Sequence, residues 1–427
     1  MSTLESPDRR QFLRQAALGA AAAALPSRAA VGDTELRIAL VGCGGRGVGA
    51  AAQALRTRGK TRLVALADAF PDRLEVARDA LRKLYGERAA LPDTACFSGL
   101  DAGEKAIALA DVVILAEPPG FRPAHVEAAV RAGRHLFLEA PVAVDAPGVR
   151  RVLAAAAAAK TQGLKIQVGF QRREQNTYRE SVAQIHGGAL GDLLAGRVYW
   201  NDGGVWLRQR EPGMTELQYQ VRNWYYFAWT GGDHIVEQLC HNLDAFRWAS
   251  RQLPVRCHGQ GGRQVRTGKE YGEIFDHHFV EYEYADGLVL HAQCRQIKNT
   301  FNRVAEHLLG TRGRAVLGRE IRTLGGELTW EFKGANNDAF QSGQDRLFAA
   351  IRDGSELNEA ESAAHSTLMA IQGRMATYSG KAVTWDEALN SRLELAPDRL
   401  AWDAQPRSRP DPNGNYAFPL PGSTIAF

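Results

Sequence analysis

Short apolar runs alternate with segments of helical spacing through the first part of the chain. Val, Ile, Leu and Ala dominate the runs, which lie at 36–41, 63–67, 111–116, 135–138 and 164–169. Between them, segments of helical length and spacing lie at 48–56, 125–132 and 146–160. Strands separated by helices of this length predict a parallel, doubly wound α/β sheet. Ligands bind such sheets at the carboxyl ends of the strands.

The pattern changes after Gly169, where apolar and polar residues begin to alternate one by one. Runs at 279–284 and 288–292 are typical of half-buried strands, and Asp286-Gly287 between them is a hairpin signal. We therefore expect a second α/β domain with an open, mostly antiparallel sheet.

A glycine-rich turn joins the first predicted strand to the first predicted helix. Glycines in this setting let backbone N–H groups approach a pyrophosphate, whose charge the amino end of the helix favours. Asp68 ends the next strand about 20 residues on, and it suits the ribose hydroxyls of NAD better than the 2′-phosphate of NADP. We predict a Rossmann-type domain over 34–170, followed by the substrate-binding domain and C-terminal tail over 171–427. The predicted cofactor contacts of the turn are Gly42, Gly44, Gly45, Arg46 and Gly47.

The first 30 residues have the pattern of an export signal. Arg9-Arg10 precedes an Ala-rich apolar run, and small residues suited to cleavage follow at 27–30. The apolar run is shorter than the roughly 20 residues of a membrane span. We predict a twin-arginine signal over 1–30, a periplasmic or otherwise exported location, and no membrane insertion.

Charge and cysteine content narrow the function classes. The formal net charge is +4, and residues 1–30 hold four Arg against two acidic residues, which leaves +2 for the rest of the chain. No basic stripe is interleaved with aromatic residues, so we expect no nucleic-acid partner. The five cysteines form no CxxC pair, which favours buried thiols over a disulfide framework.

The segment from 201 to 248 carries candidate substrate chemistry. It is rich in Trp and Tyr and also holds Arg208 and Arg222. Flat rings beside hydrogen-bonding cations suit a sugar or a cyclitol, although most aromatic side chains serve packing.

Four polar residues of this segment, His234, Glu237, His241 and Asp244, follow 3-4-3 spacing and would share one face of a helix. A buried, mutually satisfied network would explain such a stripe. One metal ion would not reach both histidines, which lie about 10 Å apart along a helix axis, so we predict no metal. We favour His241 as an acid/base or substrate-binding group that Glu237 orients.

Together these motifs resemble the Gfo/Idh/MocA oxidoreductase family, from about residue 36 to the end of the chain. VGCGGRG is similar to the family's cofactor loop, and AEPPGFRPAHVEAAVRAGRHLFLEAPVA to the stretch with its Glu-Lys-Pro signature. VGFQRR and GGDHIVEQLCHNLD resemble an exported bacterial branch.

The resemblance implies further site residues and a homo-oligomer whose dimer face is the second sheet. The implied cofactor contacts are Glu117, Pro118, Pro119, Glu139 and Gln171. The implied substrate contacts are Arg172, Tyr178, Trp206, Arg222, Trp224, His234 and Asp244.

Ala140 departs from the family pattern. By position, His241 matches the family's catalytic histidine, Glu237 its aspartate and Ala140 its lysine, which is thought to hold the reacting hydroxyl. Alanine cannot transfer a proton, a contribution worth about 10²- to 10⁴-fold in rate. Glu117 and Glu139 are the nearest candidates to replace the lysine.

Three hypotheses about function stay open. The first is an exported, NAD-dependent oxidoreductase that acts on a sugar, sugar derivative or cyclitol by hydride transfer, with a tightly bound, recycled cofactor. The second is an NAD-dependent glycosidase that works by transient oxidation and elimination. The third is a cofactor-bearing carbohydrate-binding protein that is catalytically impaired by the loss of the lysine at 140.

Overall fold

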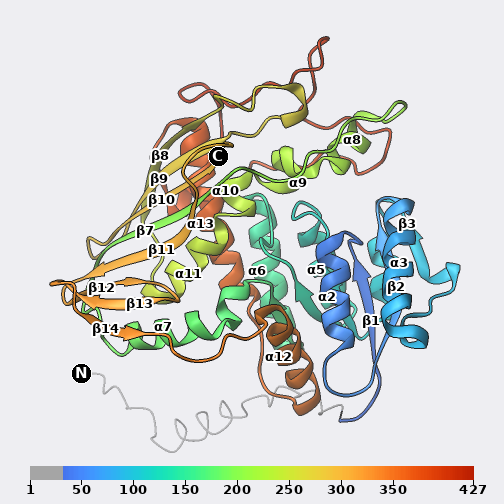
Figure 1. Cartoon of the computed structure of the whole chain (residues 1–427). Helices are drawn as coiled ribbons and strands as arrows, with labels where there is room; N and C mark the ends of the chain where they lie inside the picture. Colours follow the sequence, from blue (N-terminus) through green and yellow to red (C-terminus); the bar gives the residue numbers. More distant parts are fainter. Residues whose placement is uncertain (1–31) are drawn as a thin grey trace, which may run out of the picture.

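The computed structural model describes residues 32–427, which form two sheets connected by helices (Figure 1). The predicted twin-arginine signal at 1–30 lies outside the described residues. Within 32–427, no helix combines the length and the apolar character needed to cross a bilayer.

The first sheet has six parallel strands in the order β3-β2-β1-β4-β5-β6, which confirms the predicted doubly wound sheet. The chain order reverses beside β1, so a crevice opens between the ends of β1 and β4. The strands are β1 (Leu36–Val41), β2 (Thr61–Asp68), β3 (Cys96–Ser98), β4 (Val112–Leu115), β5 (His135–Leu138) and β6 (Ile166–Val168). The helices between them are α2 (Gly45–Leu55), α3 (Pro71–Tyr85), α4 (Ala102–Leu109), α5 (Arg122–Arg131) and α6 (Ala146–Thr161).

The second sheet has nine strands in the order β14-β13-β12-β11-β7-β10-β9-β8-β15. Only the pair β7–β10 is parallel, and β9 and β10 form the predicted hairpin, with Gly287 at φ 88° in its turn. The strands are β7 (Leu193–Asp202), β8 (Arg256–Gly262), β9 (His277–Glu283), β10 (Val289–Gln296), β11 (Arg303–Gly310), β12 (Gly313–Val316), β13 (Glu320–Thr323), β14 (Leu328–Glu331) and β15 (Val383–Thr384).

The helices of the second half are α7 (Asn176–His186), α8 (Glu216–Arg222), α9 (Ala228–Gly231), α10 (His234–Glu237), α11 (Cys240–Ser250), α12 (Ala339–Asp353), α13 (Ala360–Ser379) and α14 (Trp385–Asn390). Of these, α11 and α13 cover one face of the second sheet (Figure 1).

Helix α12 packs on the first sheet although it lies late in the sequence. Its buried Leu347, Phe348 and Ile351 join the same apolar cluster as Leu40 and Ile114 of the first sheet. The two halves are therefore not separate in space, and part of the predicted second domain completes the core of the first.

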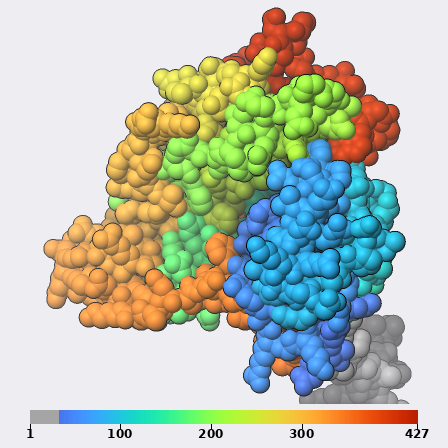
Figure 2. Space-filling model, turned by 45° about the vertical axis from the view of Figure 1, so that its right-hand side comes forward, coloured from blue at the N-terminus to red at the C-terminus, as the bar shows by residue number. Residues whose placement is uncertain are grey.

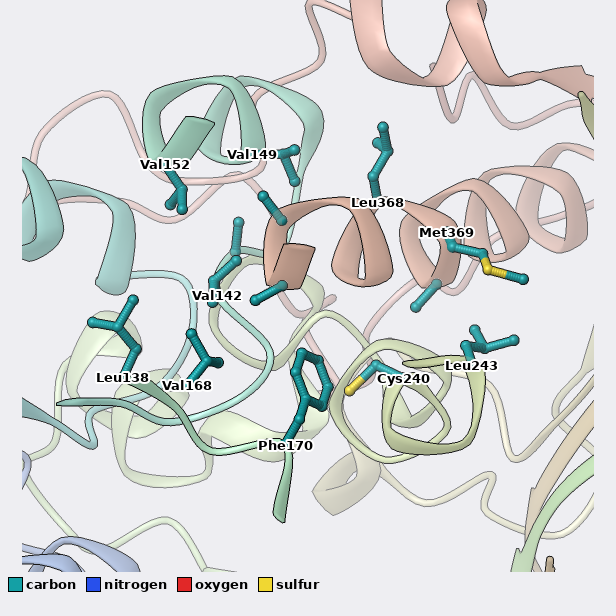
Figure 3. Close-up of a cluster of buried hydrophobic side chains, with 14 of the residues drawn as sticks. Leu138, Val142, Val149, Val152, Val168, Phe170, Cys240, Leu243, Leu368 and Met369 are labelled. Atoms are coloured by element: carbon teal, nitrogen blue, oxygen red, sulfur yellow. The ribbon is translucent and has the colours of Figure 1, made fainter. Parts of the chain in front are cut away.

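A continuous apolar core also connects the two sheets. Figure 3 shows side chains from β5, α6, β6, α11 and α13 gathered in one cluster, among them Leu138, Val152, Leu243 and Met369. The burial of these side chains from both halves fixes how the second half stands over the carboxyl ends of the first sheet's strands.

Candidate active site

The glycine turn after β1 shows two different needs for glycine. Gly42 has φ +92°, and a Cβ there would lie 2.4 Å from the backbone N of Glu117. A Cβ on Gly47 would lie 1.9 Å from the carbonyl oxygen of Gly42. At Gly44 and Gly45, in contrast, a Cβ would meet nothing within 4 Å. The first pair permits the turn, and the second pair leaves open space at the amino end of α2.

This open space is part of a cavity of about 420 Å³ at the ends of β1, β2 and β4. Asp68 lines it while its carboxylate accepts hydrogen bonds from the backbone N–H groups of Cys43 (2.7 Å) and Phe70 (3.0 Å). Burial raises the pKa of Asp68. A helix amino end and a carboxylate at the tip of β2 fit the pyrophosphate and ribose of a dinucleotide.

Some of the predicted cofactor contacts line this cavity and others do not. Arg46, Glu117 and Pro118 are on its wall, whereas Pro119, Glu139 and Gln171 are not. Glu139 lies behind the wall, where its Oε1 accepts a 2.5 Å hydrogen bond from Nε of Arg46.

Glu117 is buried against the same wall. Its Oε1 lies 3.3 Å from Nδ1 of His125, and its Oε2 has no hydrogen-bond partner. A buried carboxylate oxygen without a partner is expected to be satisfied by a bound ligand or water.

A second, smaller cavity of about 260 Å³ adjoins the first. Trp206 and Trp224 line both cavities, so the two share a wall. The other residues that line the smaller cavity are Trp200, Val205, Tyr225, Glu237, Gln238 and His241. The structure thus brings together four residues predicted from the sequence: Trp206, Trp224, Glu237 and His241.

The predicted helix that carries Glu237 and His241 is interrupted in the structure. α10 ends at Glu237 and α11 begins at Cys240, because Leu239 N–H donates to the carbonyl of His234, five residues earlier (3.2 Å). Such a widened turn shifts the faces of a helix and is frequent at functional sites. Glu237 and His241 face the cavity, whereas His234 and Asp244 are buried elsewhere.

His234 belongs to a buried network at the start of α10 and does not line either cavity. Its Nδ1 lies 2.7 Å from Asp233 Oδ1, while His278 Nε2 lies 3.2 Å from Oδ2 of the same carboxylate. The hydroxyl of Tyr378 also donates to Oδ2 (2.6 Å). His234, a predicted substrate contact, therefore lies in this buried network and on the wall of neither cavity.

Asp244 likewise has partners within the protein. It accepts two 2.8 Å hydrogen bonds from Arg173 and one of 2.7 Å from Ser366. Both of its carboxylate oxygens are therefore hydrogen-bonded within the protein.

Arg172 and Tyr178 form a layer behind the cavity wall. Arg172 Nε donates to the Tyr178 hydroxyl (3.2 Å) and lies 3.3 Å from Oε1 of buried Glu306. The Tyr178 hydroxyl in turn donates to Oε2 of Glu306 (2.8 Å). The Arg172 guanidinium lies 5.6 Å from the ring centre of Trp200. These two predicted substrate contacts therefore support the wall at Trp200.

Arg222 lines the larger cavity and not the smaller one. It donates two hydrogen bonds to Asp72 (3.0 and 2.6 Å), and its guanidinium lies 4.7 Å from the ring centre of Phe70. Through this pair the segment 203–224 reaches the nucleotide-binding half, and Figure 2 shows its light-green atoms against the blue ones. The structure places Arg222 beside the predicted cofactor site.

Burial acts in opposite senses on the two ionisable groups of the smaller cavity. It raises the pKa of Glu237 to about 7, although the charge of Arg122 and a hydrogen bond from Tyr225 oppose the shift. It lowers the pKa of His241 to about 3, and the charge of Arg172 contributes. At neutral pH His241 is therefore uncharged, and Glu237 is poised to gain or lose a proton.

Ala140 lies in the loop after β5 and packs its methyl group against the apolar core. Four residues on the wall of the smaller cavity were not among the predicted contacts: Trp200, Val205, Tyr225 and Gln238. Tyr225 belongs to the aromatic segment that drew attention, whereas strand β7 gave no sign that Trp200 would face a ligand.

Comparison with known proteins agrees with this geometry. Residues 36–170 match the Gfo/Idh/MocA model, an oxidoreductase family with an NAD-binding Rossmann fold. Inositol 2-dehydrogenase of Rhizobium meliloti (strain 1021) is 27% identical over 220 residues, 52% of this chain and 56% of that protein. Inositol 2-dehydrogenase of Burkholderia multivorans (strain ATCC 17616 / 249) is 29% identical over 215 residues, 50% and 54% of the two chains. The chain spans about half the length of these curated relatives.

Solved structures share most of this fold at low sequence identity. Aldose-aldose oxidoreductase from Caulobacter crescentus has a TM-score of 0.62 at 20% identity, covering 82% of this chain and 100% of that one. Scyllo-inositol dehydrogenase from Lactobacillus casei, with bound NAD(H) and scyllo-inositol, has a TM-score of 0.62 at 18% identity, covering 83% and 100%. Residues 36–170 therefore match the NAD-binding Rossmann domain of the Gfo/Idh/MocA oxidoreductase family.

Proposed function

We propose that this protein is an NAD-dependent oxidoreductase that acts on a cyclitol or a sugar. One observation carries the proposal: a carboxyl group with a pKa of about 7 lies in a tryptophan-lined cavity that shares a wall with the cavity at the glycine turn. With NAD bound in the larger cavity, this carboxyl group would be a proton acceptor in the adjoining cavity.

The lining of the smaller cavity favours a polyhydroxylated ring. Trp200, Trp206 and Trp224 offer flat apolar faces to the C–H groups of such a ring. Glu237, Gln238 and His241 offer hydrogen-bonding groups to its hydroxyls. Inositol 2-dehydrogenases among the relatives and an aldose-aldose oxidoreductase among the similar structures support this substrate class.

The reaction converts a secondary alcohol into a ketone. The Glu237 carboxylate would accept the proton of the substrate hydroxyl. NAD held in the larger cavity would supply the hydride acceptor as the C–H bond breaks and the carbonyl forms. His241, which is uncharged at neutral pH, would hydrogen-bond the reacting oxygen. This arrangement gives the proton to Glu237, whereas the sequence pattern favoured His241 as an acid/base or substrate-binding group that Glu237 orients.

Export and cofactor retention belong to the same proposal. We propose that the twin-arginine signal at 1–30 sends the folded, NAD-loaded protein to the periplasm as a homo-oligomer. The Arg222–Asp72 ion pair beside the cavity supports retention of the cofactor. Because free NAD is scarce outside the cytoplasm, paired oxidation and reduction of two substrates would recycle the bound cofactor.

Ala140 favours a second candidate, a carbohydrate-binding protein that holds NAD but turns over slowly or not at all. The alanine supplies no proton-transfer group in the loop after β5. A glycosidase that oxidises and eliminates is the third outcome to distinguish.

The test begins with the protein as purified. Its absorbance and a nucleotide release assay report bound NAD, and a panel of inositols, aldoses and aryl glycosides follows. Cofactor reduction at 340 nm by an inositol or aldose, without release of an aryl group, supports the oxidoreductase. Release of the aryl group favours the glycosidase, ligand binding alone favours the binding protein, and failure to bind NAD contradicts all three.

A further inference from the structure

The C-terminal tail, residues 391–427, follows α14 and holds no helix or strand in the described structure. It lies against the segment 203–224, and Figure 2 shows its red atoms beside the light-green atoms of that segment. No residue of the tail lines either cavity. Any effect of the tail on the site therefore passes through the residues that the tail contacts.

The segment 203–224 forms part of the wall of both cavities. Trp206 and Trp224 line both of them. The residues of the segment that line only the larger cavity are Arg208, Val221 and Arg222. Displacement of this one segment would therefore open both cavities together.

Two hydrogen bonds join the main chain of the tail to the region of α8. The hydroxyl of Thr215, which caps the amino end of α8, donates to the carbonyl of Trp402 (2.8 Å). Nε2 of Gln220, within α8, donates to the carbonyl of Ser408 (2.8 Å). Because Gln220 is fully buried, breaking this second bond is costly, and the bond favours the attached tail.

Tyr416 attaches the tail at a second place. Its hydroxyl donates to Oε1 of Glu216 (2.5 Å) and accepts a hydrogen bond from Nη2 of Arg210 (3.2 Å). Its ring centre lies 5.0 Å from that of Phe227, in an edge-to-face arrangement. Tyr416 is only 6% exposed, so both its ring and its hydroxyl are satisfied by the attached position of the tail.

Trp402 connects the tail to the nucleotide-binding half. Its ring centre lies 5.6 Å from that of Phe70, the residue that caps the amino end of α3 and lines the larger cavity. The guanidinium of Arg222, from the segment 203–224, lies 4.7 Å from the centre of the same Phe70 ring. One ring on the cavity wall thus contacts both the covering segment and the tail that holds this segment.

We propose that the C-terminal tail is a clasp: Trp402 and Tyr416 hold the segment 203–224 against Phe70, and NAD leaves the larger cavity only after the clasp opens. Trp402 and Tyr416 are positioning residues for cofactor binding, since neither lines a cavity. The inference rests on the proposed function, in which the cofactor is retained in the site and recycled there.

The experiment measures release of NAD from the full-length protein. Radiolabelled NAD is bound and then chased with an excess of unlabelled NAD. We expect Trp402→Ala and Tyr416→Ala each to release NAD about two- to tenfold faster than the parent, which corresponds to the loss of one aromatic pair. The rate of NAD association should not fall, whereas a general loss of structure would lower it. Trp402→Phe should restore slow release, because a ring can again pack on Phe70.

Phe418 provides a matched control in the same tail. It is 43% exposed, and its ring centre lies 5.3 Å from the guanidinium of Arg263, outside the segment 203–224. Phe418→Ala therefore removes an aromatic side chain of the tail without removing a contact of the clasp. Its release of NAD should match that of the parent.

A second measurement follows the segment 203–224 itself and needs no NAD. Trypsin cuts after arginine, and Arg208 and Arg210 lie in this segment. If the tail holds the segment in place, Trp402→Ala and Tyr416→Ala should be cut at these two sites faster than the parent. Phe418→Ala should be cut at the rate of the parent.

Two results would overturn the inference: release of NAD at the parent rate in both clasp variants, or equally fast release in Phe418→Ala. If either alanine variant does not fold, Trp402→Leu and Tyr416→Phe decide, and release and cleavage at the parent rates in both count against the clasp. Neither measurement uses a substrate. Faster release without oxidation of any inositol or aldose contradicts only the proposed function, whereas turnover with unchanged release contradicts only the clasp.

Discussion

The two cavities are adjacent but are built in different ways. The larger one is shaped by backbone: a turn that only glycine at 42 and 47 permits, and the amino end of α2. The smaller one is shaped by side chains from several places in the sequence, among them Trp200 on β7, Trp206 in the following loop and Glu237 on α10. The first is a local motif, whereas the second exists only when distant segments meet.

This difference predicts how each cavity responds to substitution. A backbone-built site tolerates changes poorly where a Cβ has no room, because the surrounding main chain cannot move aside. Where side chains form the site, replacing one of them leaves the fold intact and lowers binding or the reaction rate instead. The predictions below test that contrast, from the largest expected effect to the smallest.

The largest effect should come from Gly42→Ala. At φ +92°, the new Cβ would lie 2.4 Å from the backbone N of Glu117, so it would strain the turn and displace the end of β4. We expect the free energy of unfolding to fall by about 3 kcal/mol. We also expect the variant to lose NAD binding. Gly44→Ala is the matched control, since its Cβ meets nothing within 4 Å. Chemical denaturation and NAD titration measure both, and equal destabilisation by the two variants would contradict the distinction.

The next effect should come from Glu237→Gln, which keeps the shape of the side chain but cannot accept a proton. We expect the rate of substrate oxidation to fall by about 10²- to 10⁴-fold, with NAD affinity unchanged. The same variant should gain about 1–3 kcal/mol of stability at pH 8. The pKa of Glu237 is about 7 in the folded protein and lower in the unfolded chain. The free energy of unfolding of the parent therefore falls as the pH rises from the unfolded-state pKa to about 7, and Glu237→Gln avoids this loss. A rate like that of the parent would remove Glu237 from the reaction.

The pH dependence of turnover should follow the same carboxyl. Because Glu237 must be ionised to accept a proton and its pKa is about 7, kcat/KM should rise about tenfold per pH unit below that value and level off above it. His241, with a pKa of about 3, should add no second limb between pH 5 and 8. Stopped-flow reduction of bound NAD gives the profile, which should become flat in Glu237→Gln.

The smallest effect should come from the ion pair between Arg222 and Asp72. These side chains are 16% and 55% exposed, and such pairs contribute about 0.2–1 kcal/mol. We expect Arg222→Ala to speed NAD release by up to about fivefold without changing the fold. A double-mutant cycle with Asp72→Ala isolates the pair, and an additive cycle would show that the ion pair does not hold the segment 203–224 in place.

The sequence predicted the first sheet and its glycine turn in detail because those signals are local. A buried strand, a turn and a helix follow one another within about 20 residues, and each has its own hydrophobic pattern. Trp200 and Gln238 could not be selected in this way, since nothing near them in the sequence shows that they face a cavity.

The helix at 231–250 shows the limit most clearly. The 3-4-3 spacing placed His234, Glu237, His241 and Asp244 on one face, and two of them do line the smaller cavity. The hydrogen bond from Leu239 N–H to the His234 carbonyl widens the turn, and the core around α13 takes up His234 and Asp244. Helical periodicity predicts neighbours within an element, but it does not predict an interruption that tertiary packing imposes.

The sequence by itself determined the parallel sheet, the nucleotide turn with Asp68, and the absence of a lysine at 140, because each of these is a property of consecutive residues. Only the tertiary structure decided which polar groups share a cavity, that burial raises the pKa of Glu237 to about 7, and that Arg122 lies beside the loop of Ala140. Desolvation and the field of a buried charge depend on distances across the fold, which the linear order of residues does not specify.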